Sequence, residues 1–208
     1  MSTTYAAGDT ALLLVDVLND FLHEDGKIAG AIAPMVEKLN LKASLQRLLD
    51  GARAAGVRIV YVPHGLHEHS FDDVKHVHPR LQAAMDNKVF WQGEWGADFY
   101  EPLRPHDGDL VASQHRTFDG FIGTDLLEKL RAESIEKVVL AGLTSHTCIE
   151  STGRHALEEG FHVTFLTDAV AEFTEEAHQA AVGISYPTFG HEVTTVDGFL
   201  SAIERPAR

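Results

Sequence analysis

The chain is poor in cysteine, in basic residues and in long apolar runs, and each shortage excludes a class of protein. Its one cysteine, Cys148, cannot form an internal disulfide, which excludes a disulfide-stapled secreted scaffold and indicates a reducing compartment, the cytoplasm. No apolar stretch approaches the roughly 20 residues of a membrane span, so we expect no contact with a membrane. The 17 basic residues against 31 acidic ones give a net charge of −14, which argues against a nucleic-acid partner.

Short apolar runs alternate with helical patterns along most of the chain. The 208 residues show no linker or repeat, so we expect a single domain, 1–208. Apolar runs predict strands at 11–16, 57–62, 109–113, 137–142, 162–167 and about 192–195. Helical spacing with caps and stops predicts helices at 35–54, 123–132, 148–159, about 174–185 and 196–203. The alternation predicts a three-layer α-β-α fold of doubly wound, Rossmann-like topology, with a parallel sheet of roughly six strands.

Residues 63–109 break this alternation. The segment is rich in His, Pro, Gly and Trp and shows little periodicity. We expect a long excursion over the surface, and such excursions from a compact domain usually carry function.

Three chemically capable groups follow predicted strands: Asp16, the pair His115 and Arg116, and Cys148. In an open α/β sheet the site lies beyond the carboxyl ends of the strands, so these groups are expected to converge. Cys148 also stands at the amino end of a predicted helix, whose dipole favours a thiolate nucleophile. Each residue has an alternative interpretation: a small buried apolar residue for the cysteine, a turn cap for the aspartate, and a solvated loop for the basic pair.

Four segments resemble the isochorismatase-like cysteine hydrolases, a family that includes nicotinamidases, N-carbamoylsarcosine amidases and isochorismatases. The matching segments are LLLVDVLNDF (12–21), RIVYVPH (58–64), FDGFIGTDLLEKLR (118–131) and VVLAGLTSHTCIESTGRHALEEGFHVTFLTDAVAEFT (138–174). The resemblance implies the family's Asp-Lys-Cys triad, and Asp16 and Cys148 match two of its members.

The third member of the triad differs. The family lysine stands six residues before a phenylalanine that corresponds to Phe121, and here that position holds His115. The chain is similar in this respect to a subgroup with histidine at the same place. We expect Asp16 and His115 to activate Cys148 jointly, with Arg116 as a source of fixed positive charge, and activity to be more pH-sensitive than in a lysine enzyme.

The resemblance also implies how the site handles the substrate. A cis peptide before the nucleophile, which by position is Leu143–Thr144, aims the backbone N–H groups of Thr144 and Cys148 at the oxyanion. We expect the substrate to contact Phe21, Trp95, Arg116 and Phe121. For Trp95, a subunit interface or core packing is the alternative.

A histidine cluster raises the question of a metal. The cluster consists of His64, His67, His69, His76 and His78. Nicotinamidases of the family bind a metal through an Asp-x-His motif, and Val62 stands where the carboxylate is needed. We therefore expect no metal and no cofactor, and interpret the cluster as a polar loop near the pocket, with a metal site as the alternative.

These observations predict a metal-independent cysteine hydrolase that cleaves a C–N bond of a small amide or ureide through an acyl-thioester. One alternative is vinyl-ether hydrolysis of the isochorismate type, which does not need Cys148. Another is a binding or assembly protein that keeps the fold without catalysis. The resemblance further implies a homodimer or homotetramer.

Overall fold

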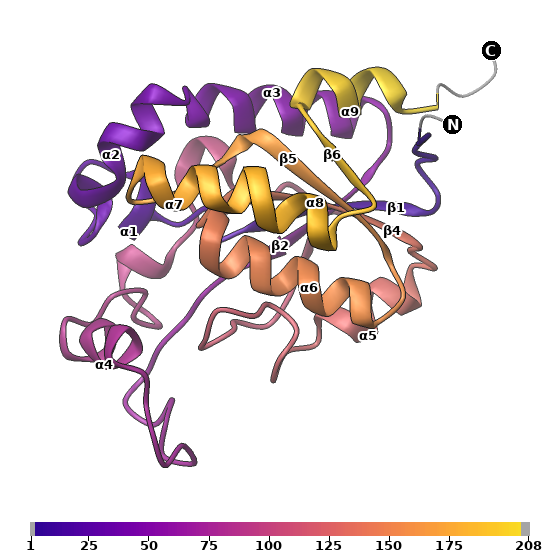
Figure 1. The fold of residues 1–208 in the computed structure, drawn as a ribbon. Coiled ribbons are helices and arrows are strands. Elements are labelled where there is room, and N and C mark those ends of the chain that lie inside the picture. The colour runs from indigo at the N-terminus through magenta and orange to yellow at the C-terminus, as the bar shows by residue number, and fades with distance from the viewer. Residues whose placement is uncertain (1–2, 205–208) are drawn as a thin grey trace.

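A computed structural model describes residues 3–204 and contains a six-stranded, all-parallel sheet (Figure 1). Its spatial order is β3-β2-β1-β4-β5-β6. The strands are β1 (Thr10–Val15), β2 (Arg58–Val62), β3 (Leu110–Val111), β4 (Lys137–Leu143), β5 (His162–Ala171) and β6 (Glu192–Thr194). The predicted α/β class and parallel sheet are confirmed.

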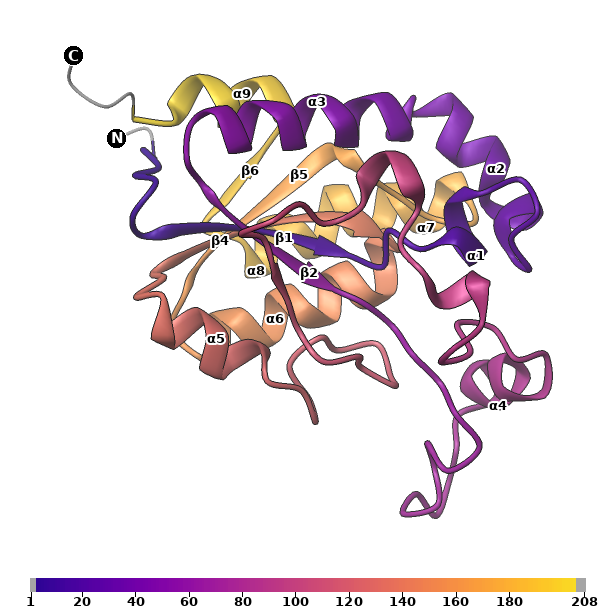
Figure 2. The same cartoon turned by 180° about the vertical axis from the view of Figure 1, so that it is seen from behind.

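Helices cover both faces of this sheet, as Figures 1 and 2 show from opposite sides. One layer contains α2 (Ala29–Lys38), α3 (Leu41–Ala54) and α9 (Val196–Ala202). The other contains α5 (Leu126–Ala132), α6 (Glu150–Glu158) and α8 (Tyr186–Phe189). The remaining helices are α1 (Asn19–Leu22), α4 (Pro79–Asp86) and α7 (Glu175–Ala180), with short turns η1 (Trp95–Ala97), η2 (Glu101–Leu103), η3 (Ser145–Ile149) and η4 (Ala181–Ser185).

The central strand β1 shows why its sequence is apolar at every position after Thr10. All six of its residues are buried. Leu12 and Leu14 pack into the core on one face, whereas Ala11, Leu13 and Val15 pack into the core on the other. A strand covered on both faces has no solvent side, so the usual polar alternation is lost.

The chain order of the sheet reverses at β1, because β2 lies on one side of β1 and β4 on the other. In doubly wound sheets the loops diverge at this switch point and leave a crevice at the carboxyl edge. Asp16 and Thr144 directly follow the two strands that flank the crevice.

Several predicted boundaries are wrong, each for a local reason. The helix predicted at 35–54 is two helices, because Asn40 adopts a left-handed conformation with φ of 49°. The helix predicted at 148–159 begins earlier, in the π-helical turn η3. The helix predicted at 174–185 continues through the π-helical turn η4 into α8, although the Thr174 cap is confirmed. Strand β5 extends to Ala171, and β3 has only two residues.

The excursion 63–109 leaves the carboxyl end of β2 and carries one regular helix, α4, away from the three layers (Figure 2). Pro79 occupies the first turn of α4, and the His78 side chain accepts the Arg80 N–H as a cap. Within residues 3–204 no helix is long and apolar enough to cross a membrane.

Candidate active site

The structure brings Asp16, His115 and Cys148 together at the carboxyl edge of the sheet. Asp16 follows β1 with a positive φ of 54°, and Cys148 lies in η3, directly beyond β4. A parallel bridge to His64 places His115 beside the end of β2. All three side chains are buried.

Asp16 and His115 form an ion pair in which both imidazole nitrogens face acceptors. Nε2 lies 2.9 Å from Asp16 Oδ1, and Nδ1 lies 2.8 Å from the Thr117 carbonyl oxygen. Only a doubly protonated ring can donate to both partners while Asp16 is ionised. Burial opposes this charge, but the Asp16 carboxylate outweighs it and raises the pKa of His115.

The second oxygen of the same carboxylate is free. Asp16 Oδ2 is buried and has no hydrogen-bond partner among the described residues. Burial raises the pKa of the Cys148 thiol well above its ordinary value, and the negative charge of Asp16 raises it further. The resting site therefore holds a neutral thiol beside a carboxylate with an unused acceptor, an arrangement suited to proton transfer from sulfur to oxygen.

Backbone N–H groups are available beside the sulfur. The Leu143–Thr144 peptide bond is cis, as the family resemblance implies. The Thr144 backbone lies within hydrogen-bond reach of the Cys148 thiol. That the Thr144 and Cys148 N–H groups form an oxyanion hole stays a prediction.

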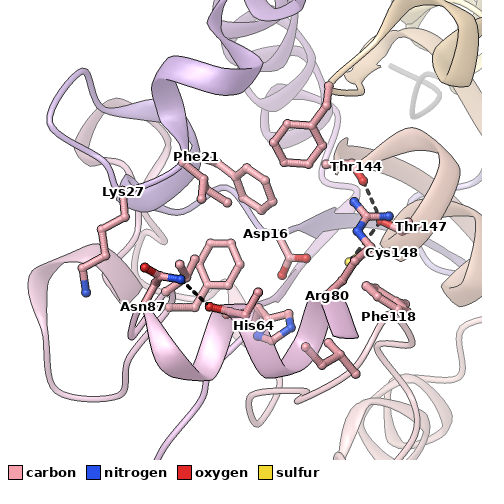
Figure 3. A pocket seen from close by; sticks show the side chains of 17 residues that line it. Asp16, Phe21, Lys27, His64, Arg80, Asn87, Phe118, Thr144, Thr147 and Cys148 are labelled. Carbon is pink, nitrogen blue, oxygen red and sulfur yellow. Dashed lines mark hydrogen bonds between the residues drawn. The ribbon is translucent and has the colours of Figure 1, made fainter. Parts of the chain in front are cut away.

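Cys148 and Asp16 open into a cavity of about 600 Å³ (Figure 3). Its walls are largely apolar, with contributions from Phe21, Ile28, Leu81, Val89, Phe90, Phe118 and Phe173. The polar side chains that line it are Asp16, Lys27, His64, Arg80, Asn87, Thr144 and Thr147. This composition is typical of a small-molecule site.

Of the residues expected to contact the substrate, only Phe21 lines this cavity. Arg116 instead forms a two-pronged ion pair with Asp73, at 2.6 and 2.9 Å, so it supplies no free charge near the thiol. Trp95 is 45% exposed and packs its edge against His23. Phe121 is buried in the core and stacks on His155 with a ring separation of 4.7 Å.

The histidine cluster is dispersed. His64 is buried against His115, whereas His67 and His69 lie out on the excursion, 6.3 Å apart between ring centres. Burial, together with His115, lowers the pKa of His64 to about 3, so this ring is neutral. Among residues 3–204 no group of three or more His, Cys, Asp or Glu side chains is placed to hold a metal ion.

Sequence reasoning missed the cavity wall that α4 provides, which includes Arg80 and Leu81. The little periodicity of residues 63–109 predicts an irregular segment there, and α4 departs from that prediction. One signal was available: a proline at the first helical position followed by good helix formers marks a helix start.

The fold and the site define an α/β protein with a cysteine-centred pocket at its topological switch point. The isochorismatase domain family matches residues 10–197, and the chain belongs to that family. Ureidoacrylate amidohydrolase RutB of Serratia proteamaculans is 28% identical over 97% of this chain and 86% of its own length.

Solved structures agree with this assignment. An isochorismatase-like hydrolase from Alkaliphilus metalliredigens is 28% identical, covers 93% of this chain and 96% of its own, and superposes with a TM-score of 0.75. A pyrazinamidase/nicotinamidase from Streptococcus mutans is 25% identical, with coverage of 89% and 99% and a TM-score of 0.70.

Proposed function

We propose that the protein is a hydrolase that cleaves a C–N bond of a small amide or ureide through an acyl-thioester on Cys148. One observation carries the proposal: the Cys148 thiol and an Asp16 carboxyl oxygen without a hydrogen-bond partner among the described residues share one largely apolar cavity. The relatives named as a ureidoacrylate amidohydrolase and a pyrazinamidase/nicotinamidase support this bond type.

The first half-reaction forms the thioester. Cys148 Sγ attacks the carbonyl carbon while its proton passes to Asp16 Oδ2, and the N–H groups of Thr144 and Cys148 hold the oxyanion. Collapse of this intermediate breaks the C–N bond. The leaving nitrogen takes the proton from Asp16 and departs as ammonia or an amine.

The second half-reaction regenerates the enzyme. Asp16 removes a proton from water, and the hydroxide adds to the thioester carbon. The sulfur then leaves, takes back the proton held by Asp16, and a carboxylic or carbamic acid is released.

His115 acts through Asp16 in this scheme. It does not line the cavity, and both of its nitrogens already face oxygen acceptors. It is therefore a positioning residue that holds Asp16 by charge and hydrogen bond, and the expected sharing of the thiol proton by His115 does not fit the geometry. A buried cation takes the place that lysine has in the family triad.

We further propose that the enzyme works in the cytoplasm as a homodimer or homotetramer and without a metal. A reducing compartment suits the scheme because oxidation of Cys148 would remove the nucleophile. No step above requires a Lewis acid.

Intact-protein mass spectrometry tests the proposal. The wild type and Cys148→Ala are mixed with a panel of small amides and ureides, quenched within seconds, and compared with steady-state release of ammonia. The expected result is turnover of at least one compound and an acyl adduct on the wild type alone. Equal turnover by Cys148→Ala, or no turnover of any compound, overturns the proposal.

A further inference from the structure

Arg80 differs from every other arginine between residues 3 and 204. Each of the others has a nitrogen within 4 Å of an Asp or Glu carboxylate. No such contact and no side-chain hydrogen bond is present for Arg80 within that range. The chain carries 31 acidic residues and a net charge of −14, so a free guanidinium is not explained by a lack of carboxylates.

The position of Arg80 indicates a role for its unpaired charge. The residue lies in the first turn of α4 and lines the same cavity as Cys148. Figure 3 draws Arg80, Thr147 and Cys148 among the side chains that line this cavity. The guanidinium carbon lies 5.8 Å from the ring centre of Phe118, another wall residue, so an aromatic face supports the cation.

The other charged side chains that line the cavity already have ion-pair partners. Lys27 Nζ lies 2.9 Å from Glu94 and also donates to the Lys88 carbonyl. Asp16, the one acidic residue in the cavity wall, is paired with His115. Arg80 is itself exposed to solvent, and among residues 3–204 it is the charged cavity-lining residue that has no ion-pair partner.

We propose that Arg80 binds a carboxylate of the substrate, so that the enzyme selects amides or ureides bearing an anionic group distal to the scissile bond. This inference rests on the function proposed above. A guanidinium presents paired donors that match the two oxygens of a carboxylate. A single free cation that is exposed to solvent matches the one negative charge of a carboxylate better than the two charges of a phosphate dianion.

In this arrangement the two ends of the substrate contact different segments of the chain. The carbonyl end of the substrate lies at Cys148 and Asp16, on the sheet side. The carboxylate lies at α4, which comes from the excursion rather than from the sheet. Substrate choice is thereby assigned to a segment separate from the reacting groups.

Binding to a catalytically silent background tests this inference independently of turnover. The Cys148→Ala protein is titrated with 3-ureidopropionate, with succinamate and with their methyl esters by calorimetry. Arg80→Gln, Arg80→Lys and Arg104→Gln are added in turn. Arg104 is an exposed arginine outside the cavity, so its variant controls for the loss of one positive charge.

We expect at least one acid to bind more tightly than its ester, and Arg80→Gln to weaken that acid roughly 10- to 100-fold, the range for a charge-assisted pair. The ester should change less than threefold. Arg80→Lys should retain part of the preference, and Arg104→Gln all of it. In the wild-type background the same loss should appear in KM more than in kcat.

Three results would overturn the inference: no acid binds better than its ester, Arg80→Gln weakens acid and ester equally, or Arg104→Gln has the same effect as Arg80→Gln. Failure of the proposed function gives a different pattern. Binding preference and its loss in Arg80→Gln would remain, whereas the protein with Cys148 intact would turn over none of the compounds.

Discussion

Replacing His115 tests whether the buried cation paired with Asp16 is needed for proton transfer from Cys148. In His115→Gln the side chain can still donate one hydrogen bond, but its charge is gone. Two unit charges about 4 Å apart attract by roughly 4 kcal/mol at an effective dielectric constant near 20. If that attraction is needed for proton transfer from Cys148, the loss corresponds to a fall of about 10³-fold in kcat/KM, since each 1.36 kcal/mol is a factor of ten.

His115→Lys is the matched variant, because it restores a charge where the family has lysine. The pKa of His115 is raised above the ordinary 6.5 by Asp16, so the cation is fully present below pH 6.5 and is lost as pH rises through the raised value. We expect wild-type kcat/KM to fall on this alkaline side. In His115→Lys the fall should move toward the ordinary lysine pKa of about 10.4, with most activity kept at neutral pH.

The assay is kcat/KM from pH 5.5 to 10 on a compound that the wild type hydrolyses, with circular dichroism to show that each variant is folded. Removing one partner of a buried pair costs roughly 3–5 kcal/mol of stability, so His115→Lys keeps the test informative if His115→Gln unfolds. The reasoning is refuted if folded His115→Gln stays within threefold of the wild type. It is equally refuted if His115→Lys keeps the wild-type alkaline fall.

Two further predictions concern the frame of the cavity. Asp20 is buried and accepts hydrogen bonds from the backbone N–H groups of Lys27, at 3.0 Å, and Phe90, at 2.7 Å. Asp20→Ala should therefore lower the free energy of unfolding by about 2–5 kcal/mol in urea titrations and raise KM. An unchanged unfolding midpoint would contradict this role. Gly142 has a φ of 117°, and a Cβ there would lie 2.0 Å from the Val15 carbonyl oxygen, so Gly142→Ala should cost more than about 2 kcal/mol. Gly183→Ala, where a Cβ meets open space, is the control, and equal stability of the two variants would count against the steric argument.

The strands and the reacting residues were predictable because local sequence determines them. β1 is apolar from residue 11 to residue 15 since both of its faces are covered, and Asp16 and Cys148 follow strands whose carboxyl ends meet. The walls of the cavity were not predictable in the same way. Arg116 and Arg80 are both arginines in polar loops or short helices. Only the tertiary fold places Asp73 beside the first and, among residues 3–204, no carboxylate within 4 Å of the second.

The aromatic residues show the same limit. Phe21, Trp95 and Phe121 are all aromatic residues, and all three lie in or near segments that resemble the family. Phe21 faces the cavity, Trp95 faces solvent and His23, and Phe121 packs on His155 in the core. Nothing in their spacing distinguishes these environments, because each depends on contacts with distant segments.

The pairing of Asp16 with His115 joins residues 99 positions apart in the chain, and Cys148 comes from a third segment. These groups meet only after β1, β2 and β4 have docked side by side, so no fragment of the sheet contains the site. Contacts so distant in sequence form late and slowly in folding. Hydrolysis is therefore expected to report completion of the whole sheet, and during refolding its recovery should lag behind the return of helical signal.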